Sequence, residues 1–179
     1  HDPTPPPEPG RSRRPDRRSL TVPRKKGPVC RGVIVPFTEE AATLDPGGRL
    51  ELDALLPTIT GKPHRIEIRG HSSGRRLPDL SRYADAWQLS YARCLAAMNY
   101  LTEHGIDPRR IRLSQGGEFE PQNRQRGSSA QAENSRVEIT ILTEWVDGFG
   151  QIRNEHGEPL EAPHFRLPGS PTKGSKVRW

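Results

Sequence analysis

The sequence predicts an α+β sandwich over residues 29–143, in which helices cover one face of a sheet between two irregular tails. Three observations predict this fold class. Segments that alternate apolar and polar residues are typical of half-buried strands, and segments with apolar residues at helical spacing separate them. The core has 115 residues, a normal domain size. Neither flank has such a period, so the chain of 179 residues is expected to carry one domain.

The first strand and helix lie in the N-terminal part of this core. Residues 29–37 are β-branched and apolar, which predicts a strand despite Pro36. The Pro-Gly-Gly run at residues 46–48 predicts a turn. Apolar residues then recur at helical spacing over residues 52–59, in a helix that Pro57 is expected to kink or end.

A second strand and a longer helix follow. Residues 64–70 alternate strictly, which predicts a strand. Asp85 and Gln88 fit a helix capping box, and Gly105 with Pro108 marks the end of the helix. The expected apolar stripe of this helix comprises Trp87, Tyr91, Cys94, Leu95, Met98 and Leu101.

Two further strands complete the predicted order βα, βα, β, β. They cover residues 110–114 and 136–142, both of which alternate apolar and polar side chains. Residues 115–134 between them are polar, with one helical turn near residues 130–133. Residues 144–179 have no period and are expected to be an irregular tail that contains glycine and proline.

The formal net charge of +6 is concentrated at the N-terminus. Residues 1–28 hold eight basic and three acidic residues and eight of the 19 prolines, which predicts a disordered basic arm. This arm is either a solvated linker or a contact for a polyanion. The other residues hold 20 basic and 19 acidic groups, so no specific nucleic-acid binding is expected. No run reaches the roughly 18 apolar residues of a membrane-spanning helix.

The two cysteines indicate no metal site. Cys30 and Cys94 match no metal-ligand spacing, and neither a cofactor nor a metal is predicted. They either form a disulfide in an oxidising compartment or remain buried thiols. The chain begins at His1 and lacks the charged and apolar regions of a leader, which is consistent with a removed signal or anchor, or with a fragment.

A serine-hydrolase pattern is present but weakly supported. Residues 70–74 read Gly-His-Ser-Ser-Gly, which matches the G-x-S-x-G nucleophile elbow with Ser72 as the nucleophile. That motif requires a helix directly after the serine, whereas residues 75–78 read Arg-Arg-Leu-Pro. The chain is therefore not expected to be an enzyme, with the serine hydrolase kept as a remote alternative.

Several segments in order resemble the OmpA-like C-terminal domain. They are Ile66–His71, Ala86–Arg93, Tyr100–Leu101, Gly105–Ile106, Arg110–Ile111, Gly117–Pro121 and Asn134–Ile139. The Trp-Gln-Leu-Ser run at residues 87–90 is most similar to the MotB-type branch. The resemblance implies a βαβαββ fold with a mixed four-stranded sheet, and a non-catalytic, periplasmic module that anchors its parent protein to the cell wall by binding peptidoglycan.

The resemblance also implies a ligand site. In the family, an aspartate after Gly-His-Thr and the arginine of Leu-Ser-x-x-Arg hold the zwitterionic end of diaminopimelate in the peptidoglycan stem peptide. Arg93 occupies the arginine position, where a guanidinium can pair with a carboxylate, and Ser73 replaces the aspartate. A serine hydroxyl supplies no charge, which would weaken binding roughly ten- to a hundred-fold. Asp79 or Asp85 could supply the missing charge from the intervening loop.

The remaining site candidates have structural alternatives. His71 either contacts the ligand or packs or hydrogen-bonds at the end of the strand, and Ser72 is a further candidate for ligand contact. Asn134 and Arg136 either contact the ligand or brace the surrounding loops, and Arg93 could instead form a surface salt bridge. The expected cleft lies between residues 70–84 and the first turns of the following helix.

Two principal functions remain open. The first is peptidoglycan binding in the periplasm or cell envelope through the stem-peptide carboxylate. The second is a protein-interaction scaffold that has lost diaminopimelate binding because of Ser73, with the tails contacting envelope partners. A homodimer is left open in both.

Overall fold

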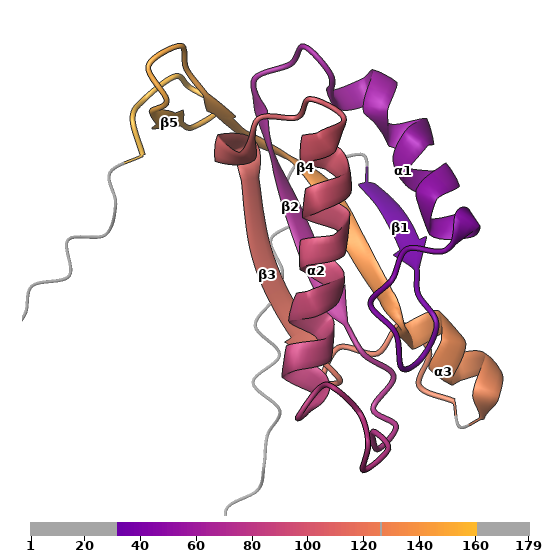
Figure 1. The fold of residues 1–179 in the computed structure, drawn as a ribbon. Helices are drawn as coiled ribbons and strands as arrows, with labels where there is room; N and C mark the ends of the chain where they lie inside the picture. Colours follow the sequence, from indigo (N-terminus) through magenta and orange to yellow (C-terminus); the bar gives the residue numbers. More distant parts are fainter. Residues whose placement is uncertain (1–31, 126, 161–179) are drawn as a thin grey trace, which may run out of the picture.

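A mixed sheet with strand order β1-β4-β2-β3 forms the centre of the computed structural model, which describes residues 32–125 and 127–160 (Figure 1). A short strand, β5, pairs with β4. Helices α1 and α2 pack on one face of the sheet, as expected for the α+β class. The elements in chain order are β1 (Gly32–Pro36), α1 (Pro46–Ile59), β2 (His64–His71), α2 (Ala86–Glu103), η1 (Pro108–Arg110), β3 (Ile111–Gly117), α3 (Ser128–Asn134), β4 (Arg136–Val146) and β5 (Ile152–Arg153).

Strand β2 lies inside the sheet, parallel to β3 and antiparallel to β4. Its alternation has the predicted effect: Ile66 and Ile68 are completely buried in the core, and Glu67 and Arg69 are only partly buried. Because β2 and β3 are parallel, the loops that follow them leave the sheet at the same end.

Helix α2 begins and ends at the residues that the sequence predicts. The Asp85 carboxylate accepts a hydrogen bond of 2.8 Å from the Gln88 backbone N–H. The Gln88 side chain accepts one of 3.0 Å from the Ala84 N–H, one residue before the usual capping-box donor. Gly105 follows the helix with a φ of +85°, a conformation that glycine adopts without strain.

The buried face of α2 is rotated from the predicted stripe. It consists of Leu89, Ser90, Arg93, Cys94, Ala97 and Leu101. Trp87 and Tyr91 were expected in the core but are 45% and 44% exposed. The small side chains of this face allow a close approach to the sheet: a Cβ atom on Gly70 would lie 2.2 Å from the Ser90 carbonyl oxygen.

Helix α1 starts earlier than predicted. Residues 46–48, expected to form a turn, are its first turn, because Asp45 caps the helix with a 2.7 Å hydrogen bond from the Gly48 N–H. Pro46 occupies the first turn, where the missing N–H has no intrahelical partner to lose. The helix then continues through the exposed Pro57 to Ile59.

Strand β4 extends four residues beyond its predicted end at Leu142. It continues to Val146 and forms a hairpin with β5, in which Trp145 pairs with Arg153. The Asp147 carboxylate closes the turn by accepting hydrogen bonds from the backbone N–H groups of Phe149 and Gln151. Part of residues 144–160, which the sequence predicted to be an irregular tail, therefore forms β-strands.

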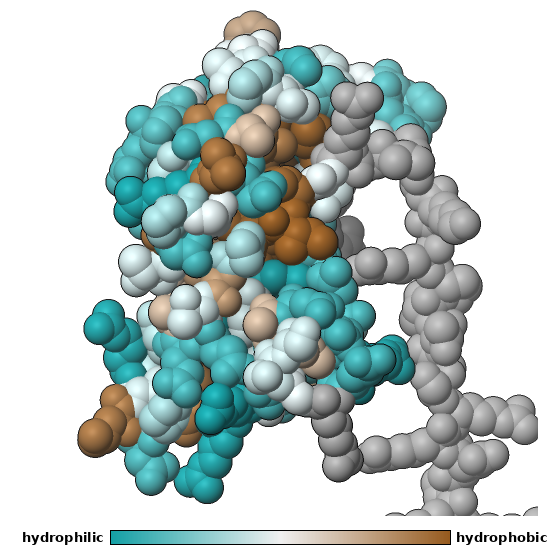
Figure 2. Space-filling view, turned by 90° about the vertical axis from the view of Figure 1, so that its right-hand side faces the viewer, coloured by the Kyte–Doolittle hydropathy of each residue, from teal (hydrophilic) through white to brown (hydrophobic). Residues whose placement is uncertain are grey.

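The sheet has an apolar patch near one edge. Figure 2 views the side on which β1 and α1 lie in Figure 1, where brown side chains gather within a mainly polar surface. Ile34 of β1 and Leu50 of α1 are the large exposed apolar residues of these two elements, at 47% and 68%. Pro36 ends the edge strand β1 and offers no backbone donor there.

The thiol of Cys94 is free and buried against the sheet, 3.4 Å from the Ser114 carbonyl oxygen. Burial raises the pKa of this thiol to about 12, so it is unreactive at neutral pH. Cys30, the basic arm of residues 1–28 and residues 161–179 of the predicted tail lie outside the described residues.

Candidate functional site

Arg93 lies inside the domain and binds backbone carbonyls. Its side chain is 0% exposed. Nε donates to Ala41 O at 2.9 Å and Nη1 to His71 O at 2.8 Å. Nη2 donates to Thr38 O at 2.7 Å and to Glu39 O at 2.6 Å. The guanidinium therefore ties the loop after β1 to the end of β2.

These contacts offset the free-energy cost of burying the positive charge of Arg93. Carbonyl dipoles surround the guanidinium, and its carbon lies 5.6 Å from the centre of the Phe37 ring. Burial lowers the pKa of Arg93 to about 10, so the side chain stays positively charged at neutral pH. The family resemblance implied that this guanidinium pairs with a ligand carboxylate in the expected cleft. The structure contradicts that role, because Arg93 belongs to the buried face of α2 and its donors are occupied by backbone carbonyls.

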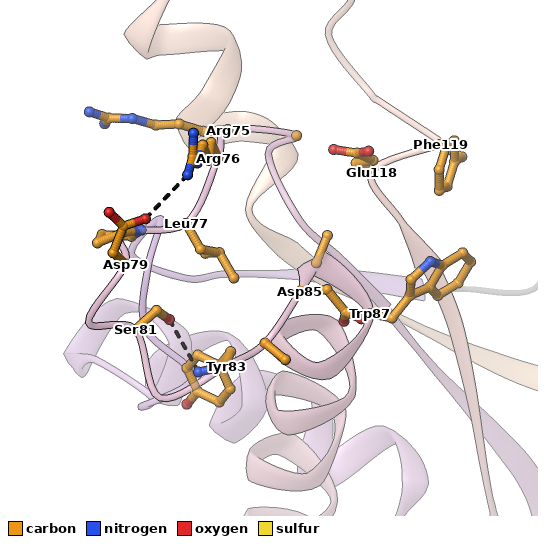
Figure 3. Close-up of a pocket in the computed structure, with 14 residues that line it drawn as sticks. Arg75, Arg76, Leu77, Asp79, Ser81, Tyr83, Asp85, Trp87, Glu118 and Phe119 are labelled. Carbon is orange, nitrogen blue, oxygen red and sulfur yellow. Dashed lines mark hydrogen bonds and ion pairs between the residues drawn. The ribbon is translucent and has the colours of Figure 1, made fainter.

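A groove is nevertheless present where the sequence predicts one. A pocket of about 620 Å³ lies between the loop after β2, the first turn of α2 and the residues that follow β3 (Figure 3). It is lined by Gly74, Arg75, Arg76, Leu77, Pro78, Asp79, Ser81, Tyr83, Ala84, Asp85, Ala86, Trp87, Glu118 and Phe119. We call this pocket the loop pocket.

Charged side chains line two sides of the loop pocket. Figure 3 shows Arg75, Arg76 and Asp79 on one side and Glu118 on the other. Arg75 forms an ion pair of 2.9 Å with Glu39, outside the pocket, and Arg76 forms one of 3.2 Å with Asp79. The Arg76–Asp79 pair is almost fully exposed, so it holds neither side chain firmly.

Glu118 is the uncommitted acid of this pocket. It is exposed, and no hydrogen bond or ion pair to it is found among the described residues. Its Oε2 lies 3.3 Å from the place a Cβ atom on Gly74 would occupy, which is next to Ser73 in the chain. Asp85, by contrast, already accepts the capping hydrogen bond of α2.

Two aromatic rings form the pocket wall beside Glu118. The centres of the Trp87 and Phe119 rings are 5.7 Å apart and the rings are tilted by 31°. Phe119 is 67% exposed. Gly117, with a φ of +54°, passes close to the Trp87 ring, where a Cβ atom would lie 3.3 Å from it.

The serines at the end of β2 lie beside the loop pocket and do not line it. Ser72 is 5% exposed, and its backbone N–H donates to Gly117 O at 2.9 Å. Its Oγ has no hydrogen-bond partner in the described part of the chain, so the contact to a base that a nucleophile needs is not formed there. The half-buried Ser73 accepts a hydrogen bond of 3.3 Å from the Arg75 N–H.

His71, Arg136 and Glu138 form a charged cluster on the sheet. Arg136 is 4% exposed and donates two hydrogen bonds, of 2.9 and 2.5 Å, to Glu138 Oε1. His71 is 1% exposed, and its Nε2 lies 3.6 Å from the same oxygen. The pKa of Glu138 is lowered to about 2, first by His71 and then by Arg136. His71 and Arg136, two of the predicted ligand contacts, are therefore buried at this end of the sheet.

The loop after β3 is held by contacts that the sequence only partly predicts. Asn134 forms two hydrogen bonds with the Asn123 backbone, of 2.9 and 2.8 Å, as expected for a bracing residue. Arg69 pairs with both carboxylate oxygens of Glu120, at 2.8 and 2.6 Å. The Arg69–Glu120 pair was not predicted from the sequence, although Arg69 is one of the polar residues of the alternating strand at residues 64–70.

The described residues contain no cluster of three His, Cys, Asp or Glu side chains that could hold a metal ion. Within the same residues, no helix is both long and apolar enough to cross a bilayer.

The fold and this site define a small α+β domain with a surface groove between two loops and a helix start. Residues 36–135 match the OmpA family, and the chain belongs to it. The resemblance seen in the sequence is thereby confirmed.

Relatives of the MotB type support the same assignment. Motility protein B of Escherichia coli K12 is 26% identical over 146 residues, which cover 76% of this chain and 47% of that protein. The chain thus spans about half the length of the curated relatives that it matches.

Solved structures share the fold. The C-terminal domain of Helicobacter pylori MotB has a TM-score of 0.56 at 20% identity, over 65% of this chain and 87% of that one. A putative MotB-like protein from Desulfovibrio vulgaris has a TM-score of 0.53 at 28% identity, over 60% and 69%. The cell wall anchor of the T6SS from Pseudomonas aeruginosa has a TM-score of 0.54 at 24% identity, over 62% and 79%.

Proposed function

We propose that this domain binds peptidoglycan and holds its parent protein to the cell wall in the periplasm. Membership of the OmpA family supports this function, as does the likeness to periplasmic domains of MotB and to a cell wall anchor. The groove beside the start of α2 offers a surface where such a ligand could be held.

The loop pocket is the proposed peptidoglycan site, and its position is the observation that carries the proposal. It opens between the loop after β2 and the start of α2, where the sequence predicts the ligand. In this proposal Arg93 is a positioning residue. It holds the end of β2 and the loop after β1 in place through four carbonyl oxygens, and it does not contact the ligand.

The stem peptide supplies the charges that match this pocket. Its free amino group would pair with Glu118, the carboxylate that faces the loop position next to Ser73. Its carboxylate would pair with Arg76, whose exposed contact to Asp79 is readily exchanged. Glu118 would then provide the negative charge that Ser73 lacks.

Sedimentation with insoluble sacculi tests this proposal. The chain should sediment with the sacculi, and Glu118→Gln should lower the retained fraction several-fold, because one charge-assisted contact is lost. Glu103→Gln, on the exposed surface at the other end of α2, is the matched control and should be retained like the unmodified chain. No retention of the unmodified chain would contradict the proposal.

A protein-interaction scaffold is the second candidate. The interior position of Arg93 and the exposed rings of Trp87, Tyr91 and Phe119 favour it. Its expected result is the absence of sacculus binding together with recovery of an envelope protein by crosslinking at this aromatic wall.

A further inference from the structure

Two aromatic rings border the loop pocket and take no part in the charge contacts proposed for the stem peptide. Trp87 lies in the first turn of α2, and Phe119 lies in the turn after β3 (Figure 3). Their ring centres are 5.7 Å apart, and Trp87 is 45% and Phe119 67% exposed. We call these two rings the aromatic wall. Large apolar groups that are grouped at the open side of a pocket indicate a ligand contact.

The backbone at Gly117 gives the aromatic wall a defined shape. The Phe119 N–H donates to Gly116 O at 3.2 Å and closes a tight turn. Gly117 has a φ of +54°, and a Cβ atom there would lie 3.3 Å from both Cδ2 and Cε2 of Trp87. Because glycine adopts this φ without strain and carries no Cβ, the chain can pass directly against the indole. The Trp87 ring is therefore in place before a ligand arrives, which lowers the entropy cost of binding.

A hydrogen-bond acceptor adjoins the aromatic wall. Figure 3 shows the Glu118 carboxylate beside Phe119, on the same side of the loop pocket. Glu118 is exposed and forms no hydrogen bond or ion pair within the described part of the chain. Its two oxygens can accept a hydrogen bond from a hydroxyl group as well as from an amino group.

This combination selects against a purely apolar partner. An apolar side chain of another protein, seated on both rings, would displace water from Glu118 without offering a donor, which costs free energy. A ligand that has both an apolar face and hydrogen-bond donors at its edge avoids this cost. The aromatic wall therefore fits such an amphipathic ligand better than it fits the apolar anchor of a protein.

A sugar in its pyranose form has these two features. Its axial C–H bonds form an apolar face that stacks on the electron-rich face of an aromatic ring. Its hydroxyl and acetamido groups lie around the edge of the ring and donate hydrogen bonds. The volume of the loop pocket, about 620 Å³, lies within the roughly 300–1,000 Å³ of ligand pockets.

We propose that the aromatic wall binds an N-acetylated sugar of the glycan strand. This inference rests on the proposed function, because it takes peptidoglycan as the ligand. The C–H face of the sugar stacks on Trp87 and Phe119, and a hydroxyl or acetamido N–H group donates to Glu118. The aromatic wall thus recognises the sugar, and the charged side chains of the loop pocket recognise the peptide.

Nuclear magnetic resonance titration of the ¹⁵N-labelled full chain with tri-N-acetylchitotriose tests the proposal. This β-1,4-linked trimer of N-acetylglucosamine carries no peptide. It should cause saturable shifts of the Trp87 indole N–H and the Phe119 backbone N–H. The Trp145 indole, which donates to Asn154 O at 3.1 Å, is the internal control and should not shift. Sorbitol has hydroxyl groups but no ring face, and should bind at least about tenfold more weakly.

Variants of Phe119 separate stacking from general apolar contact. Phe119→Leu keeps most of the apolar area but removes the aromatic face, so it should weaken chitotriose binding about two- to tenfold. Phe119→Tyr keeps the ring and should bind like the unmodified chain. Both variants should fold, because Phe119 is exposed. Phe149→Leu, at a 93% exposed phenylalanine between β4 and β5, is the matched control and should not change the affinity.

The results distinguish this inference from the proposed function. If the chain sediments with sacculi but chitotriose gives no saturable shift, the sugar contact is wrong and peptidoglycan binding stands. Equal chitotriose affinity of Phe119→Leu and the unmodified chain would also overturn the sugar contact, as would crosslinking of an envelope protein at the aromatic wall without chitotriose binding. Absence of sacculus retention would contradict the proposed function, and with it the glycan strand as the source of the sugar.

Discussion

Arg93 Nη1 donates a hydrogen bond of 2.8 Å to the carbonyl oxygen of His71, the last residue of β2. The same guanidinium binds the loop after β1, so one buried side chain of α2 holds this loop and the end of β2 together. The family motif around Arg93 thus has a structural explanation in this chain, whatever ligand the pocket takes.

Arg93→Ala should lower the free energy of unfolding by about 3 kcal/mol or more, because four carbonyls lose a charged donor and a buried cavity remains. Arg93→Lys should cost less, since an ammonium retains some of these contacts. Urea denaturation measures both. Arg82→Ala is the control, expected within about 0.5 kcal/mol of the unmodified chain, and equal stability of all three variants would show that the Arg93 contacts contribute nothing.

Glu138 should make the domain sensitive to acid. Its folded-state pKa of about 2 lies below the ordinary value of 4.5, so its contribution is present above about pH 5 and is lost as the pH falls toward 2. Allowing for partial solvent screening, the loss is about 2 kcal/mol. His71 is the first cause of the lowered pKa, and the two hydrogen bonds from Arg136 add to it.

Glu138→Gln tests this assignment. Stability measured by urea denaturation between pH 7 and pH 3 should fall less steeply in the variant, because the group that takes up a proton is gone. Glu155→Gln, an exposed residue in the turn after β5, is the control and should keep the original slope. An unchanged slope in Glu138→Gln would assign the acid sensitivity to other carboxylates.

Gly70→Ala should destabilise the packing of α2 on β2 by about 3 kcal/mol. The new methyl group would lie 2.2 Å from the Ser90 carbonyl oxygen and 2.7 Å from Cys94 Sγ, so the helix must move away from the sheet. Gly148→Ala has no atom within 4 Å and should be nearly neutral. Thermal denaturation compares the two, and similar melting temperatures would show that the helix shifts at little cost.

The sequence predicted the strands and the capped start of α2, because these depend on local patterns, whereas the place of the loop pocket was predicted from the resemblance to the OmpA-like domain. Alternation identified β2, and Asp85 with Gln88 identified the helix start. The hairpin of β4 and β5 was missed, although the Asp-Gly turn at residues 147–148 is a typical hairpin signal.

The position of Arg93 could not be predicted from such patterns. Hydropathy assigned the aromatic side chains of α2 to the core, whereas the helix buries Ser90 and Arg93 and leaves Trp87 and Tyr91 half exposed. Burial of Arg93 depends on carbonyls of Thr38 and Ala41, which lie 55 and 52 residues away in the chain. Only the folded backbone brings these acceptors together.

Ser73→Asp is the direct test of the charge proposed for the loop pocket. If the amino group of the stem peptide lies between Glu118 and the loop after β2, a second carboxylate should tighten binding about tenfold. The measurement is calorimetry with a soluble stem peptide that contains diaminopimelate, at low and high salt, since added salt should reduce the gain in affinity.

Ser73→Asn is the matched control. Asparagine is similar in size to aspartate and has no charge, so this variant should leave the affinity near that of the unmodified chain. Unchanged or weaker binding by Ser73→Asp would show that residue 73 does not face the amino group, and the ligand contact would then have to be sought along Trp87 and Phe119.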